Sequence, residues 1–168
     1  MIELEAGTHL LHFIAGALQS TWLLSGSGGY GFLASIEHMT SRQRAGKAFI
    51  TCNTGETICA PSRVSAADTP GQQLAEATHV ACASSDGRLL TFAITDLRTM
   101  PNGGRGLMLM SLEDKASLVG AAAYARSIRV SGIGRGSKPR EETLEIRSLS
   151  NAAGVRGRKG KDAGWTFK

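Results

Sequence analysis

The amino-acid sequence repeats itself at a spacing of 58 residues, and this repeat limits the folds that the chain can adopt. Residues 31–50 align on residues 89–108, and a third copy over residues 143–161 needs four extra residues. Every copy has an isoleucine, a large apolar residue three positions later, and then a glycine beside a basic residue. These landmarks are Ile36, Met39, Gly46 and Lys47; Ile94, Leu97, Gly104 and Arg105; and Ile146, Leu149, Gly160 and Lys161. The chain is therefore built from units of one kind.

A glycine-rich stretch in the first unit has the spacing of a dinucleotide-binding loop. Gly26, Gly28 and Gly31 spell G-x-G-x-x-G, but that loop needs an acidic residue roughly 20 positions on, and the neighbourhood of Cys52 offers no carboxylate before Glu56. The same slot holds an Asp-Gly turn (84–87) in the second unit and a glycine-rich turn (131–139) in the third. Turn residues without a shared phosphate-binding pattern are typical of β-hairpins. We therefore predict three hairpins and no nucleotide cofactor.

Repeated units of this length, with several short strands each, are typical of propeller blades that bury their faces against one another. The sequence predicts an all-β, propeller-like array of about three four-stranded blades in one domain over residues 1–168. The approximate blade boundaries are 1–70, which includes the end of a preceding blade, then 71–125 and 126–168. Residues 71–77 and 111–122 are predicted to form at most a turn or two of helix.

The basic residues are concentrated in the last quarter of the chain. Residues 126–168 carry a net charge of +7, residues 1–125 carry −2, and the whole chain carries +5. Such clustering suits a phosphate-binding surface, because each neutralised phosphate releases condensed counterions. A solvated basic tail is the alternative. The sequence has no apolar run long enough for a membrane span and no basic signal-peptide start, so a cytoplasmic protein is predicted.

Candidate metal-binding and catalytic groups are few. The three cysteines, Cys52, Cys59 and Cys82, lie among apolar or small residues and are expected to be reduced thiols. His9 and His12 have no further ligand at metal-binding spacing, so a structural role is expected. We assign no catalytic residue and no metal site.

Three stretches of the sequence carry a family resemblance. GGYGF (28–32), RAGKA (44–48) and RGRKGK (156–161) resemble the C-terminal DNA-binding domain of the A subunit of bacterial type IIA topoisomerases. The resemblance covers essentially the whole chain and is closer to topoisomerase IV than to gyrase, because no stretch is the full Q-R-R-G-G-K-G box of gyrase. It implies a β-pinwheel, in which neighbouring blades exchange strands, here as a partial ring with DNA bent around its basic outer rim.

The resemblance implies that the glycine-basic loops contact DNA phosphates. Glycine permits a tight loop while the long cation reaches a phosphate oxygen. We expect Gly46, Gly104 and Gly160 to be structural turns in equivalent outer loops. The predicted DNA-binding residues are Arg42, Arg44, Lys47, Arg105, Arg156, Arg158, Lys159 and Lys161. Five more basic residues around the third hairpin extend this path unless nearby glutamates pair with them: Arg126, Arg129, Arg135, Lys138 and Arg140.

The function that the resemblance implies is DNA binding and bending, which positions a duplex for ATP-dependent strand passage in decatenation and supercoil relaxation. Tyr30 and Tyr124 do not match the family's cutting tyrosine, which lies in a separate N-terminal domain. We expect Tyr30 to be a hairpin side chain and Tyr124 to lie in the core or in an interface. The implied partners are double-stranded DNA, the catalytic N-terminal part of the A subunit, and the ATPase B subunit, near the bacterial nucleoid and away from membranes. ATP and Mg²⁺ belong to other parts of the enzyme.

Two alternative functions remain open at this point. The first alternative is that the chain is the C-terminal domain of the gyrase A subunit. The second is that it is a propeller-like protein-interaction module whose basic rim binds an acidic partner. We also expect Met1 to begin inside a blade, with residues 2–13 as the closing strands of a preceding unit.

Overall fold

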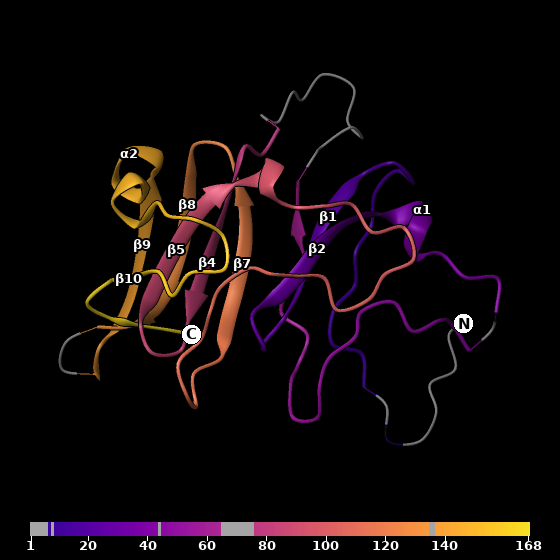
Figure 1. Cartoon of the computed structure of the whole chain (residues 1–168), viewed down its shortest axis with the longest axis horizontal. Coiled ribbons are helices and arrows are strands. Elements are labelled where there is room, and N and C mark those ends of the chain that lie inside the picture. The colour runs from indigo at the N-terminus through magenta and orange to yellow at the C-terminus, as the bar shows by residue number, and fades with distance from the viewer. Residues whose placement is uncertain (1–6, 8, 44, 65–75, 135–136) are drawn as a thin grey trace.

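Three antiparallel β-sheets lie side by side in an open array, and each is built around one hairpin (Figure 1). The computed structural model describes residues 7, 9–43, 45–64, 76–134 and 137–168. The all-β, propeller-like prediction is confirmed. The third sheet has three strands in the described part of the chain, where four were predicted.

The first two sheets have four strands each, in the orders β3-β1-β2-β6 and β10-β5-β4-β7, and the third has the order β11-β8-β9. The strands of the first sheet are β1 (Thr21–Gly26), β2 (Tyr30–Ser35), β3 (Ser62–Arg63) and β6 (Leu107–Met108). Those of the second are β4 (His79–Ser84), β5 (Arg88–Ala93), β7 (Leu118–Tyr124) and β10 (Lys161–Asp162). Those of the third are β8 (Ser127–Ile133), β9 (Pro139–Glu145) and β11 (Thr166–Phe167).

The outer strand of each four-stranded sheet comes from the following unit. β6 comes after the second hairpin in the chain but pairs with β2 of the first, and β10 comes after the third hairpin but pairs with β5 of the second. We call β6 and β10 the exchange strands. The strands β3, β7 and β11 pair instead with the first strand of their own unit's hairpin. The sheets therefore do not coincide with continuous stretches of sequence.

The 58-residue repeat appears directly in the hairpins. β1 and β2 have the same lengths as β4 and β5 and lie 58 positions earlier. The landmark isoleucine of each unit begins a short helix: α1 (Ile36–Met39), the 3-10 helix η1 (Ile94–Asp96) and α2 (Ile146–Leu149), which η3 (Ser150–Ala152) extends. In all three units this isoleucine donates its backbone N–H to the residue just before the hairpin. The isoleucine therefore closes the hairpin.

The glycine-rich stretch of the first unit is a hairpin turn, as predicted. Gly26 ends β1 and Gly31 lies in β2, so the G-x-G-x-x-G spacing spans two antiparallel strands. Gly29 at the turn has φ +84, and a Cβ there would lie 2.5 Å from the carbonyl oxygen of Met110. Gly87 has the same φ of +84 in the second hairpin. Residues 135–136 of the third turn lie outside the described residues.

Apolar side chains are buried on both faces of the middle sheet. Leu90 of β5 packs in a cluster with Leu23 of β1, whereas Leu89 packs with Val130 of β8 and Phe167 of β11. Neighbouring residues of a strand point to opposite faces, so consecutive leucines serve different clusters. The middle sheet thus holds the two outer sheets in place.

Residues 111–122, for which at most a turn or two of helix was predicted, contain no helix. Residues 118–122 belong to β7, and residues 111–117 form a loop with a turn at Asp114–Lys115. Pairing with β4 and burial of Leu118 and Ala121 in the core outweigh the weak local helix tendency. Residues 71–75 of the other expected segment lie outside the described residues.

We predict that Gly160→Ala destabilises the domain more than the matched change Gly164→Ala. These glycines have φ +74 and +76, so both substitutions carry a similar backbone strain of about 1–2 kcal/mol. At Gly160 the added Cβ would also lie 2.7 Å from the carbonyl oxygen of Leu89, whereas the space at Gly164 is open. Thermal unfolding followed by circular dichroism should show the larger fall in Tm for Gly160→Ala. Equal falls would contradict the contact with Leu89.

Candidate nucleic-acid interface

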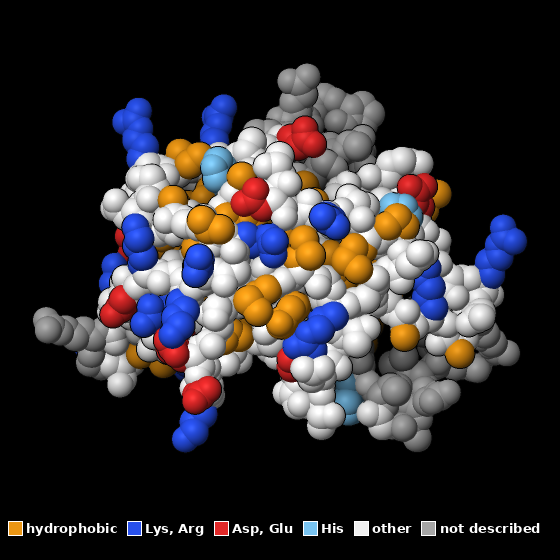
Figure 2. All heavy atoms as spheres, viewed as in Figure 1, with side chains coloured by type: hydrophobic (Ala, Val, Ile, Leu, Met, Phe, Trp, Pro, Cys, Tyr) orange, Lys and Arg blue, Asp and Glu red, His pale blue; other side chains and the backbone are white. Residues whose placement is uncertain are grey.

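Six of the predicted basic residues, Arg42, Lys47, Arg105, Arg156, Arg158 and Lys159, lie on three loops that connect the short helices to the segments that follow, and Lys161 begins β10. These loops span residues 40–49, 97–106 and 153–160, and we call them the outer loops. The second and third lead directly into β6 and β10, which are edge strands, so they lie at the periphery of the array. Figure 2 shows basic side chains spread over the viewed face, with acidic ones among them and several over the side that holds β10.

Arg105 of the second outer loop is bound by a carboxylate. Its guanidinium donates two hydrogen bonds to Glu56, at 2.9 and 3.4 Å, and its Cζ lies 4.2 Å from the centre of the Tyr30 ring. Backbone N–H donation from Asn53 lowers the pKa of Glu56 most, and the Arg105 guanidinium lowers it further, while partial burial acts in the opposite direction. This arrangement fixes the loop beside the pair formed by Tyr30 and Met108.

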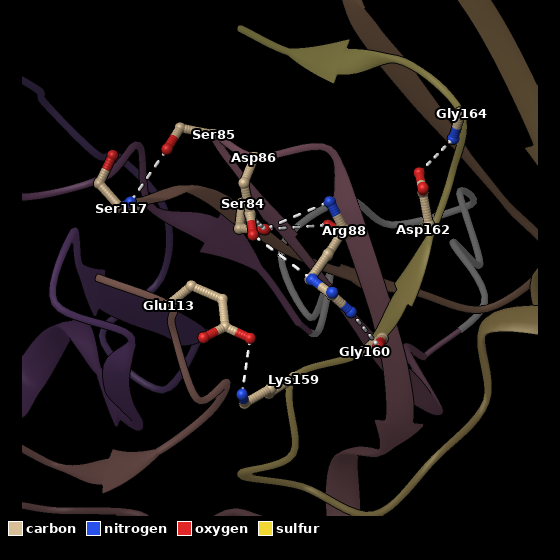
Figure 3. Close-up of polar contacts among 10 residues, drawn as sticks. All are labelled: Ser84, Ser85, Asp86, Arg88, Glu113, Ser117, Lys159, Gly160, Asp162 and Gly164. Atoms are coloured by element: carbon tan, nitrogen blue, oxygen red, sulfur yellow. Dashed lines mark hydrogen bonds and ion pairs between the residues drawn. The ribbon is translucent and has the colours of Figure 1, made fainter. Parts of the chain in front are cut away.

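Lys159 of the third outer loop is held in the same way. Its Nζ lies 2.6 Å from Glu113 (Figure 3). Glu56 ends a turn that begins at Asn53, and Glu113 begins the turn that ends at Ala116. Each turn precedes the segment that returns to its own hairpin. We call the turns at residues 53–56 and 113–116 the return turns. In each return turn a glutamate binds a cation of the next unit, and this cation lies directly before the glycine that precedes an exchange strand. We call each such ion pair a clamp.

Arg88 is a further basic residue at this junction that sequence reasoning missed. Its Nε lies 3.4 Å from Asp86, and its Nη1 donates to the carbonyl oxygen of Gly160 at 3.3 Å. Figure 3 shows Arg88 extending from β5 toward the backbone of Gly160. Arg88 occupies the place of Tyr30 in the repeat, where no basic residue was expected. The only available signal was its position directly after the turn glycine Gly87.

The other described residues of the predicted set have no acidic partner among the described residues. Arg42, Arg158 and Lys161 are exposed and have no ion pair with a described residue. Lys47 donates to the carbonyl oxygen of His38, and Arg156 donates to that of Met108 at 2.6 Å. Neutral carbonyl partners leave the positive charge uncompensated. Arg44 lies outside the described residues.

Two of the five basic residues around the third hairpin are paired with glutamates. Arg129 lies 3.4 Å from Glu141, and Arg140 lies 2.6 Å from Glu142. The guanidinium of Arg140 also lies 4.8 Å from the centre of the Trp165 ring. The described residues Arg126 and Lys138 are exposed, and Arg135 lies outside the description.

The expectation that Gly46, Gly104 and Gly160 occupy equivalent positions is wrong for Gly104. Gly106 lies against the carbonyl oxygen of Gly31, with a built Cβ 2.4 Å away, and Gly160 lies against that of Leu89. Gly31 and Leu89 are themselves equivalent, 58 residues apart. Gly106 is therefore the partner of Gly160, because the outer loops differ in length. Gly46 has φ +75 and nothing within 4 Å.

The other candidate groups have structural surroundings. Tyr124 is buried in the core, which raises its pKa, and Tyr30 stacks on Arg105 at the hairpin end. Burial also raises the pKa of the Cys82 thiol. Within the described residues, no group of three or more His, Cys, Asp or Glu side chains is arranged to hold a metal ion. No described helix is long and apolar enough to span a membrane.

Comparisons with known proteins agree with this geometry. Residues 78–124 match the family described as DNA gyrase C-terminal domain, beta-propeller. The chain is 30% identical over 159 residues to the A subunit of DNA topoisomerase 4 from Neisseria gonorrhoeae, a match that covers 94% of this chain and 20% of that relative. The chain belongs to the family of C-terminal domains found in the A subunits of gyrase and topoisomerase IV. It spans about a fifth of the curated relative that it matches.

Solved structures of these C-terminal domains share the fold. The E. coli ParC C-terminal domain superposes with a TM-score of 0.78 at 22% identity, over 96% of this chain and 62% of that one. The DNA gyrase A C-terminal domain gives 0.64 at 16% identity, over 91% and 48% of the two chains. The β-pinwheel fold that the resemblance implied is therefore confirmed.

We predict that Glu56→Gln lowers stability at neutral pH and that this loss shrinks in acid. The pKa of Glu56 in the folded chain lies below its ordinary value of 4.5. Its carboxylate therefore stabilises the fold fully above pH 4.5, and the contribution disappears as the pH falls through the lowered pKa. Urea unfolding at a series of pH values should show that the difference in the free energy of unfolding between the unmodified chain and Glu56→Gln becomes smaller in acid. In the Arg105→Ala variant part of the pH dependence of stability should remain, because the backbone N–H of Asn53 still donates to the Glu56 carboxylate. A pH-independent difference would contradict this view of Glu56.

Proposed function

We propose that this domain binds double-stranded DNA along its outer loops and bends the duplex around the periphery of the array. The observation that carries the proposal is the exposed charge of Arg158 on the third outer loop and of Lys161 directly after it, neither of which has an ion pair with a described residue. Arg42 and Lys47 on the first outer loop continue this charge. The net charge of +7 over residues 126–168 supports the same surface. Family membership adds that the relatives belong to DNA topoisomerases and gyrases.

The chemistry of these loops suits phosphate contacts more than base recognition. Long cations on turns reach phosphate oxygens, which carry no sequence information. Binding is therefore driven by counterion release and depends steeply on salt. The clamped cations Arg105 and Lys159 contribute less, since Glu56 and Glu113 already neutralise them. They join each of these outer loops to a turn of the preceding unit.

In the whole enzyme, we propose that the domain positions a duplex for ATP-dependent strand passage, which underlies decatenation and supercoil relaxation. It acts at the nucleoid, together with the catalytic N-terminal part of the A subunit, and with the ATPase B subunit. Cleavage and ATP hydrolysis belong to those other parts, which also hold ATP and Mg²⁺. The relative at 30% identity favours topoisomerase IV over gyrase.

Removal of Arg158 and Lys161 together tests the proposal. Arg158→Ala with Lys161→Ala should weaken binding to every duplex alike, and should reduce the slope of log affinity against log salt by roughly two units. The matched control is Arg129→Ala with Arg140→Ala, which removes the same charge from glutamate-paired residues and should change the slope less. Fluorescence anisotropy with duplexes of unrelated sequence measures both the affinity and its dependence on salt.

An unchanged affinity and slope in the Arg158 and Lys161 variant would contradict the proposed interface. Tight binding of the unmodified chain to an acidic protein, with no binding to any duplex, would favour the protein-interaction module instead.

We predict that Glu113→Gln strengthens DNA binding by releasing Lys159 from its clamp. The freed cation can contact a phosphate, and one competing negative charge is lost, so affinity at low salt should rise several-fold with a steeper salt slope. Combining Glu113→Gln with Lys159→Ala should cancel most of the gain. A gain that persists without Lys159 would mean that Glu113 acts by general repulsion and not through the clamp.

A further inference from the structure

The three outer loops form a row, and the second of them, residues 97–106, lies between the other two (Figure 1). The backbone N–H of Gly104 in the second loop donates to the carbonyl oxygen of Phe49, at the end of the first. In the same way, Gly157 of the third loop donates to the carbonyl oxygen of Leu109, just after the second. A duplex that contacts the first and the third loop therefore passes over the second.

The glycine-basic pattern supplies little available charge in the second loop. Arg105 is bound by Glu56, and its side chain is only 30% exposed, whereas the side chain of Lys159 in the third loop is 56% exposed. The exposed turn residues Pro101 and Asn102 are uncharged. The residues of this pattern therefore leave the middle of the row weakly charged.

The second loop carries a further cation, Arg98, which lies outside the glycine-basic pattern. Arg98 is exposed and has no ion pair with a described residue. It directly follows the landmark leucine Leu97, at the position that Thr40 holds in the first unit and Ser150 in the third. A cation thus occupies this position in the unit whose Arg105 is held by two hydrogen bonds.

The backbone fixes Arg98 on the outer edge of β2. Its carbonyl oxygen accepts a hydrogen bond from the N–H of Leu33 at 3.0 Å. The guanidinium of Arg156, from the third loop, is attached to the same edge, because it donates to Met108, which pairs with Tyr30. Tyr30 and Leu33 are three residues apart in β2, so the two points of attachment are roughly 10 Å apart at the rise of a β-strand.

We infer that Arg98, and not Arg105, is the phosphate contact of the second outer loop. The inference rests on the proposed function and adds a binding residue that the glycine-basic pattern does not contain. Phosphates of one strand follow one another at about 3.4 Å along the helix axis, so a separation of roughly 10 Å corresponds to about three phosphates. Arg98 and Arg156 are therefore spaced to bind the same DNA strand as it crosses from the third loop to the second.

Modification of the unmodified 168-residue chain with phenylglyoxal, an arginine reagent, tests the inference directly. Mass spectrometry compares the modification of each arginine with and without a saturating duplex at low salt. Arg98 and Arg158 should be protected several-fold by the duplex, whereas Arg129, which is paired with Glu141, should react equally in both states. Protection of Arg158 without protection of Arg98 would overturn the inference and leave the proposed function standing. Protection of neither residue would contradict both.

The salt dependence of binding distinguishes a phosphate contact at Arg98 from shielding by DNA nearby. Arg98→Ala should reduce the slope of log affinity against log salt by roughly one unit, and Arg98→Lys should retain the slope, because either cation releases counterions. The matched control Arg129→Ala removes the same charge from a glutamate-paired residue and should change the slope less. An unchanged slope in Arg98→Ala, with a reduced slope when Arg158 and Lys161 are replaced, would overturn this inference alone.

Discussion

The close backbone contact between a glycine and the strand that receives the next unit is the constraint on which the rest of this structure depends. At Gly106 and Gly160 the receiving carbonyl oxygens lie 2.4 and 2.7 Å from a built Cβ, so only a residue without a side chain fits. This contact lets a two-residue strand pair at the sheet edge, although so short a strand has few hydrogen bonds of its own. The position of each outer loop, and of its cations, follows from this contact.

The two clamps divide the basic residues into structural and available charges. Arg105 and Lys159 each precede a contact glycine and are bound by an acid from the return turn. An ion pair between exposed groups contributes little stability by itself, but here each joins two loops that are distant in sequence. The ion pairs also change which cations are available to an anion. A phosphate must compete with Glu56 or Glu113 for these cations, whereas Arg158 and Lys161 have no such competitor among the described residues.

The fold could be predicted from the sequence because its signals are local. Turn residues, apolar strands and the 58-residue spacing together indicated three hairpins, and β1, β2, β4 and β5 follow that spacing. The equivalence of the glycines could not be predicted, because the distance from the landmark isoleucine to the contact glycine is 12 residues in one unit and 14 in the next. The clamps were missed because their partners lie 49 and 46 residues apart and no local pattern links them.

The same glycine-basic pattern therefore has different consequences in different units. In the second unit arginine suits the clamp, because its planar guanidinium binds Glu56 through two nitrogens and stacks on Tyr30. In the third unit Arg88 replaces that tyrosine, no ring is available, and a lysine with a single contact to Glu113 occupies the clamp. The side chain of Arg105 is 30% exposed and that of Lys159 is 56% exposed. The third outer loop, which also carries Arg158, is thus the place where the clamp yields most readily to a phosphate.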